Sequence, residues 1–170
     1  FINASVGNIL ELDDVHRTSI IHPGDTIIPA AIATASHKKV TTLNFLIAII
    51  SGYEAAIRMG NCLGPKHYKT FYSSSTCGVF GAATASSYIL NVNNDKKSFT
   101  ENLKNSLNLA TMTSSGIWQC RNGEGEAKQY ALANASKCGV TAAYMAQHDS
   151  KAPIDMIEGE LGFLKGYAEK

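Results

Sequence analysis

The sequence lacks long apolar runs, has little charge and contains no closely spaced cysteine pair. Charged residues make up 17% of the 170 residues, and Lys+Arg 15 against Asp+Glu 14 leave a net charge of +1. No overall electric field therefore attracts nucleic acid or an anionic membrane. The longest apolar run, LNFLIAII at 43–50, is too short to span a bilayer. We expect a cytoplasmic protein with neither of these partners.

The four cysteines, Cys62, Cys77, Cys120 and Cys138, are far apart in the sequence. This spacing argues against a zinc site or a redox couple and indicates reduced, buried thiols. The chain begins with Phe1 rather than Met. We therefore expect it to have been cut out of a longer protein.

Strand signals are also scarce, because no segment alternates cleanly between apolar and polar residues. Helical spacing recurs instead. It predicts helices over about 2–16, 26–39, 41–60, 75–90, 98–116 and 124–147. We expect one all-α domain over residues 1–170, with about six helices packed around the apolar 43–59 helix.

Local signals place the ends and contacts of these helices. Thr26 is a candidate N-cap, and Pro29 then falls in the first turn, where an intrahelical N–H is not needed. Ser98 and Glu101 form a candidate capping box. Glycines and alanines dominate residues 78–85, so another helix can approach that surface closely.

The stretch LELDDVHRTSIIHPGD, residues 10–25, places acids close to histidines. Such a cluster is typical of proton transfer, of a metal site or of a polar helix end. On a helix that continues to residue 16, Asp13 and His16 would share a face with spacing suitable for metal ligands. No second cluster completes a ligand set, so we expect no metal. His16 is interpreted as a helix-end imidazole stabilised by the helix dipole.

His22 differs from His16 because it stands directly before Pro23 and Gly24. The proline restrains the backbone around the histidine, and loops held on a rigid scaffold often carry functional side chains. A histidine that merely packs against helix ends explains the same pattern equally well.

Lys128 stands at the start of a predicted helix, where the positive end of the dipole disfavours a cation. A partly desolvated lysine there suits a base or an anion anchor, although a solvated surface lysine is the simpler alternative. Ser75 and Thr76 stand at the start of another helix, whose N–H groups and hydroxyls could bind a carboxylate. Ordinary N-capping is the alternative there.

Six motifs follow one another along the chain: LDDVHRTSIIHPGDTIIPAAIA, AIISGYEAAIRMG, STCGVFGAATA, TSSGIWQ, GEAKQ and EGELGFLKGY. Together they resemble the MmgE/PrpD family, which includes 2-methylcitrate dehydratases, cis-aconitate decarboxylases and an iminodisuccinate epimerase. The resemblance implies a large all-α domain joined to a smaller α/β lid, usually in a homodimer. It also implies a site between the two domains, without a metal or an organic cofactor.

The family's site residues can be matched to positions in this chain. The resemblance implies catalytic roles for Asp13, His22 and Lys128, and substrate binding by Asp14 and Glu11. The remaining histidine and tyrosine of the family's site belong to the lid, which would follow this chain.

Two positions depart from the family's usual pattern, and each removes an imidazole. Family members often show K-x-x-H-x-G, whereas Ala131 and Ala133 follow Lys128 here. They also often show Phe-His before the serine–threonine loop, whereas this chain has Phe71-Tyr72. Tyr72 is therefore a candidate for substrate binding or for a different proton-transfer role, and Ser75 and Thr76 are candidates for substrate binding.

We expect a cofactor-independent lyase, similar to 2-methylcitrate dehydratase, acting on a small di- or tricarboxylic acid. It would remove a proton next to a carboxylate and then release water, which requires a positioned base and stabilisation of the enolate. Decarboxylation or epimerisation of a similar acid is the alternative. The competing class is a non-catalytic helical scaffold or dimerisation domain without its lid.

Overall fold

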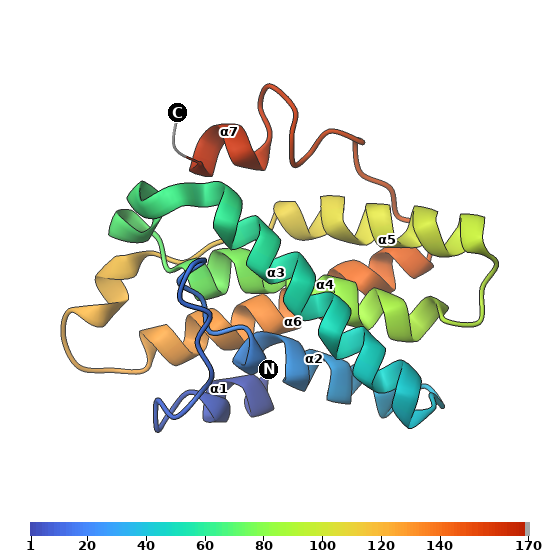
Figure 1. Cartoon of the computed structure of the whole chain (residues 1–170), viewed down its shortest axis with the longest axis horizontal. Coiled ribbons are helices and arrows are strands. Elements are labelled where there is room, and N and C mark those ends of the chain that lie inside the picture. Colours follow the sequence, from blue (N-terminus) through green and yellow to red (C-terminus); the bar gives the residue numbers. More distant parts are fainter. Residues whose placement is uncertain (169–170) are drawn as a thin grey trace.

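The computed structural model describes residues 1–168, which form seven α-helices, one short 3₁₀ helix and no strand. The elements are α1 (Ile2–Gly7), α2 (Gly24–Ala35), α3 (Thr42–Thr70), α4 (Ser73–Asn91), α5 (Lys96–Thr111), η1 (Trp118–Arg121), α6 (Ala127–Gln147) and α7 (Phe163–Tyr167). The predicted all-α class is confirmed. In Figure 1, α3 crosses the front of the molecule diagonally, α5 and α7 lie at the top, and α1 and α2 lie at the bottom.

The centre of the domain is α4, and the prediction that the 43–59 helix is central is wrong. Every residue of α4 except Tyr88 is buried. The helix contacts α2, α3, α5 and α6, so it lies inside a cage of four neighbours.

Side-chain size explains why α3 lies outside the centre although it is rich in leucine and isoleucine. Its buried positions include four small residues spaced four apart, Ala48, Gly52, Ala56 and Gly60. Its large side chains Leu43, Leu46 and Ile50 remain exposed. Apolar character therefore permits burial without requiring it. Within residues 1–168, neither α3 nor any other helix combines the length and hydropathy needed to cross a membrane.

The small residues of α4 allow its neighbours to approach closely, as the sequence predicts. A Cβ atom on Gly81 would lie 2.7 Å from the Ile27 side chain of α2 and 2.8 Å from the Gly52 carbonyl of α3. A Cβ atom on Gly139 of α6 would lie 2.5 Å from the Cβ of Ala82. Three helices thus meet α4 at distances that no larger side chain would permit.

The first helix is much shorter than predicted, because α1 ends at Gly7 and residues 8–23 form an irregular loop. The apolar residues of this segment that recur at three- and four-residue steps, Ile2, Val6, Ile9 and Leu10, are exposed. Asn8 is instead fully buried. Its side-chain amide donates a hydrogen bond to Asp13, which draws the chain back on itself.

The shorter α1 overturns both interpretations of His16. Asp13 and His16 share no helix face, and His16 is not a helix-end imidazole. It pairs through its backbone with Ile21, and its Nδ1 lies 2.8 Å from Ser19 Oγ. Its role in the described chain is to shape a turn.

Several helix starts also differ from prediction by a few residues. Helix α2 begins at Gly24 with Pro23 as its N-cap, and Thr26 lies inside the first turn, where its hydroxyl donates to the Pro23 carbonyl. Helix α5 is capped by Asp95, whose carboxylate accepts from two backbone N–H groups, rather than by Ser98. Helix α3 is capped by Thr41, whose hydroxyl accepts a hydrogen bond from the Asn44 N–H.

Helix α3 also continues beyond its predicted stop at Gly60. It breaks only at Gly64, where φ is 73°, and Pro65 then opens a final helical segment that ends at Thr70. A left-handed glycine followed by a proline is a common way to end one helix and begin another. The predicted 60–75 loop is therefore mostly helical.

The four cysteines are free thiols, but only Cys77 is buried. Cys62 is exposed, and Cys120 and Cys138 are partly exposed. The prediction of buried thiols thus holds for one of the four.

Gly81→Ala should destabilise the domain by about 1–3 kcal/mol, the usual cost of overpacking a tight interior. The added methyl group would collide with Ile27 and with the Gly52 carbonyl. Gly166→Ala is the matched control, because a Cβ atom there meets nothing within 4 Å. Urea unfolding of both variants checks this, and equal midpoints would contradict the packing argument.

Candidate active site

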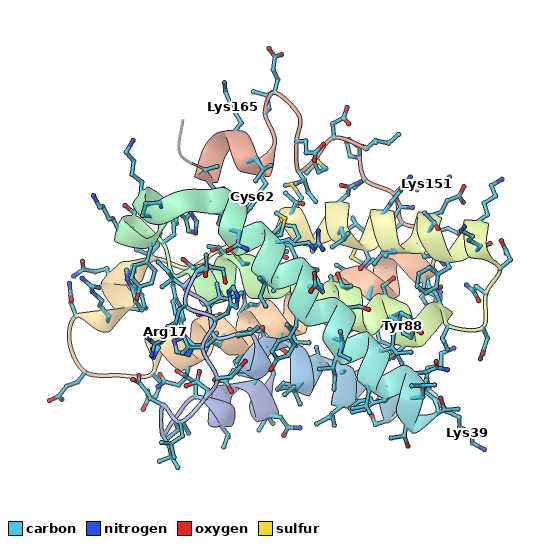
Figure 2. All side chains as sticks on the ribbon, viewed as in Figure 1. Arg17, Lys39, Cys62, Tyr88, Lys151 and Lys165 are labelled. Carbon is cyan, nitrogen blue, oxygen red and sulfur yellow. The ribbon has the colours of Figure 1, made fainter. Side chains whose placement is uncertain are left out.

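The α1–α2 loop, residues 8–23, is held on the helical body by hydrogen bonds at its end. The backbone N–H of His22 donates to Ser74 Oγ on α4 at 2.9 Å. The N–H of Gly24 donates to Asp14 Oδ1 at 3.0 Å. These bonds fix the backbone on both sides of Pro23, so His22 stands on a restrained segment. Figure 2 shows Arg17 in this loop, at the left of the molecule.

His22 is oriented by two oxygen atoms that face the same ring nitrogen. Its Nδ1 lies 3.0 Å from Asp13 Oδ2 and 2.9 Å from the Asp14 backbone carbonyl oxygen. Both oxygens are acceptors, so Nδ1 carries the hydrogen and Nε2 of the neutral ring keeps its lone pair. The His22 side chain is 31% exposed, so this second nitrogen can serve as a base at the surface of the site.

Asp13 is the buried centre of this arrangement, with only 4% of its side chain exposed. Its Oδ2 also accepts a hydrogen bond from Asn8 Nδ2 at 2.8 Å. The carboxyl of Asp25 lies close by. Burial and the neighbouring Asp13 carboxyl raise the pKa of Asp25 from 3.8 to about 7, partly offset by the Asn8 amide.

Asp14 points to the start of α2 rather than to His22. Besides accepting from Gly24, it lies near the Tyr53 hydroxyl of α3. Burial and the Asp14 carboxylate raise the pKa of Tyr53, which stays a neutral phenol. Asp14 therefore supports His22 through its backbone carbonyl, and its side chain fastens the loop.

Lys128 at the start of α6 forms an ion pair with the same loop. Its Nζ donates to Glu11 Oε1 at 2.6 Å, with 16% of the lysine side chain and 62% of the glutamate side chain exposed. Glu11 and Asp13 are two residues apart, so their backbones are separated by at most about 7 Å. One short segment thus contacts both Lys128 and His22.

Tyr72 lies beneath this cluster, at the N-cap of α4, and is 1% exposed. Its ring stacks on Trp118 at 4.7 Å between centroids. Its hydroxyl is buried, and none of the groups in residues 1–168 gives it a hydrogen bond. Burial raises the pKa of Tyr72, the nearby Ser74 hydroxyl partly offsets this, and the carboxylate of Asp13 adds to the rise.

Cys120 lies near both Tyr72 and Lys128. Its thiolate would interact unfavourably with ionised Tyr72 and favourably with the Lys128 ammonium. Burial raises the pKa of Cys120, so the thiol stays protonated. Tyr72 therefore lies within electrostatic range of Asp13 and Cys120, and Cys120 lies within range of Lys128.

Ser75 and Thr76 are both buried and hydrogen-bonded within the helical body. Ser75 Oγ donates to the Ala131 carbonyl at 3.0 Å and joins α4 to α6. Thr76 Oγ1 lies 2.8 Å from Nε2 of the buried His67. Their substrate-binding roles stay predictions, and Ser74 is the hydroxyl that touches the loop.

The larger hollows on the described surface lie away from this cluster. One of about 590 Å³ lies between the end of α2 and the start of α3, around residues 35–45. Another of about 660 Å³ lies between α5 and residues 151–158. Figure 2 places Lys39, beside the first hollow, at the opposite end of the view from Arg17. Neither hollow contains a predicted site residue.

Among residues 1–168, no group of three His, Cys, Asp or Glu side chains is arranged to hold a metal ion. The polar cluster pairs acids with His22 and Lys128 individually. Its geometry suits proton transfer and the binding of charged groups.

These observations define an all-α domain in which acidic residues orient a histidine on a restrained loop. The chain belongs to the MmgE/PrpD family, because the model of the MmgE/PrpD N-terminal domain matches residues 1–170. It is also similar to "Cis-aconitate decarboxylase-like protein oryM" of Aspergillus oryzae (strain ATCC 42149 / RIB 40), with 27% identity over 155 residues. That match covers 86% of this chain, which spans 31% of the relative's length.

Sequence reasoning missed Asp25, Ser74 and Trp118 as parts of this cluster. Asp25 directly follows the His-Pro-Gly motif, and that position was the available signal. Ser74 is one of four consecutive hydroxyl residues, and only the fold shows which one meets the loop. Trp118 carries no local signal for its stacking on Tyr72.

Tyr72→Phe should leave stability unchanged or raise it slightly, because the removed hydroxyl makes no hydrogen bond within the described chain and its burial is costly. The phenyl ring retains the stacking on Trp118. If the hydroxyl serves substrate, the same variant should lose turnover. Thermal unfolding and steady-state assays of the intact protein check the two effects. A loss of stability would show that the hydroxyl is a structural group.

Proposed function

We propose that this chain supplies the helical-domain half of the active site of a cofactor-independent lyase. The substrate is a small di- or tricarboxylic acid that loses a proton from the carbon next to a carboxylate and then loses water. The observation that carries this proposal is the His22–Asp13 pair, with its acceptor-bound Nδ1 and free Nε2.

In the proposed step, His22 Nε2 takes the proton from carbon, and the electron pair moves into the adjacent carboxylate as an enolate. The carbon acid is weak, so the base must be positioned and the new charge must be stabilised. Asp13 fixes the ring and stabilises the imidazolium that forms. The buried Tyr72 hydroxyl is a donor that no other group in residues 1–168 uses, so it can serve the enolate or the leaving hydroxide.

Lys128 supplies the positive charge for a substrate carboxylate. In the described structure Glu11 forms an ion pair with this ammonium, and the glutamate side chain is largely exposed. An arriving carboxylate can replace Glu11 without leaving the ammonium unpaired. Charge-assisted pairs of this kind are stronger than neutral hydrogen bonds.

Decarboxylation of a similar acid is the second candidate, supported by the name of the Aspergillus oryzae relative. Epimerisation would use the same proton abstraction with return of a proton to the other face. The absence of an imidazole at positions 72 and 131 distinguishes this chain from the usual family pattern and bears on all three outcomes.

His22→Ala in the intact protein should lower kcat by about 10²–10⁴, the usual contribution of a general base. Lys128→Ala should raise KM about 10- to 100-fold, as expected for loss of a charged hydrogen bond. His37→Ala and Lys137→Ala, at exposed positions outside the cluster, are the matched controls. An unchanged kcat in His22→Ala together with an unchanged KM in Lys128→Ala would overturn the assignment.

A panel of citrate-like acids in D₂O, followed by NMR and by carbon dioxide release, separates the candidate reactions. Dehydration gives an alkene without carbon dioxide, decarboxylation releases carbon dioxide, and epimerisation incorporates deuterium at a retained carbon. No turnover of any acid by the intact protein would support the non-catalytic scaffold instead.

A further inference from the structure

We propose that Asp25 is a positioning residue that shares one proton with Asp13 and thereby keeps His22 uncharged until it takes a proton from substrate. The role of His22 in this inference rests on the proposed function. The shared proton does not, because it follows from the surroundings of the two carboxyl groups.

The first observation is the placement of the Asp25 carboxyl. It lies against the end of α1, where a Cβ atom on Gly7 would be 2.6 Å from Oδ1. Its Oδ2 is buried, and no donor among the described residues reaches it. An ionised carboxylate with such an oxygen is costly. A protonated Asp25 removes the problem, because it becomes a donor.

The second observation is that another carboxyl group, that of Asp13, lies beside Asp25. The two carboxyl groups meet at the end of α1, because Asp25 lies against Gly7 and the next residue, Asn8, donates to Asp13 Oδ2. The Asp13 carboxyl contributes to the raised pKa of Asp25. Two carboxyl groups this close cannot both ionise easily, so one proton between them is the stable state. Asn8 completes the set by donating to Asp13 Oδ2.

Other titratable groups also face Asp25, and each is accounted for. They are Asp13 and Asp14 from the loop, Tyr53 from α3 and Tyr72 from α4. The two phenols have raised pKa values and remain neutral. Asp14 is an anion that accepts from the Gly24 N–H, and its charge further disfavours ionisation of Asp25.

The shared proton sets the charge that faces His22. With the proton present, the Asp13–Asp25 pair carries one negative charge spread over two groups, which orients the imidazole without forcing it to be charged. In the chemical step one proton moves from substrate carbon to Nε2. The shared proton stays between the carboxyls, and their single charge then stabilises the imidazolium.

The test follows the ring nitrogens of His22 by NMR in intact protein carrying ¹⁵N-histidine, with the signals assigned by His22→Gln. In the wild type, ionisation of Asp25 adds a second charge beside the ring, so the His22 titration should show two coupled steps. In Asp25→Asn it should show one step, because no second carboxyl can ionise beside Asp13. The control is Asp149→Asn, an exposed position after α6, which should titrate like the wild type.

Unfolding measurements give a second readout that does not depend on NMR. The pKa of Asp25 is about 7 in the folded protein, against 3.8 for an ordinary aspartate such as that of the unfolded chain. Between these two pH values the folded state holds a proton that the unfolded state has released. The Asp25 contribution to stability should therefore fall as pH rises from about 4 to 7 and stay level above 7. Asp25→Asn should lack this contribution and resist urea better than the wild type at pH 8.

These outcomes separate the inference from the proposed function. Identical His22 titrations and parallel pH–stability curves in wild type and Asp25→Asn would overturn the shared proton. If Asp25→Asn does not fold, Asp25→Ser serves in its place, because it also removes the charge. A coupled titration together with full turnover in His22→Ala would support the shared proton and would reject the lyase mechanism.

Discussion

The close packing of other helices around α4 is the constraint on which the rest of the structure depends. Glycine and alanine along α4 let α2, α3 and α6 approach its backbone directly. The N-terminal end of the same helix carries Ser74, whose hydroxyl accepts a hydrogen bond from the α1–α2 loop. Because interiors at this density barely deform, the start of α4 is a fixed platform, and the loop residues attached to it inherit its rigidity.

Close packing holds the helices in place, whereas hydrogen bonds between polar groups hold the α1–α2 loop. A loop of sixteen residues, 8–23, could adopt many conformations, yet the Asn8–Asp13, His22–Ser74 and Asp14–Gly24 hydrogen bonds fix its ends and its middle. Several large apolar side chains of this loop stay exposed, so burial of apolar surface contributes little to holding it. The shape of the candidate site therefore depends on specific hydrogen bonds and charges, and it should respond to pH and to single polar substitutions more than the helical body does.

The helical class, most helix positions and the small-residue surface of α4 could be predicted, because periodicity and glycine content are local properties. The central helix could not be predicted. Helix α3 is rich in leucine and isoleucine, but the crowded centre of the domain is filled by α4, which has smaller side chains. The end of α1 was also missed, because Asn8 leaves the helix for a partner at Asp13 that periodicity does not reveal. The family motifs predicted site roles for His22, Asp13, Lys128 and Glu11, whereas the Asp25 carboxyl joins the candidate site only through tertiary contact.

Charge balance connects the two ends of the site. Glu11 neutralises Lys128, one proton between Asp13 and Asp25 leaves a single charge on that pair, and Asp14 remains an anion. The cluster is therefore negative overall, and a polycarboxylate would be repelled from it. On the proposed function, substrate binding must remove a negative charge from the loop, and Glu11 is the exposed acid that can move away. Exchange of Glu11 for a substrate carboxylate keeps Lys128 paired, and it brings the substrate to the segment that also orients His22.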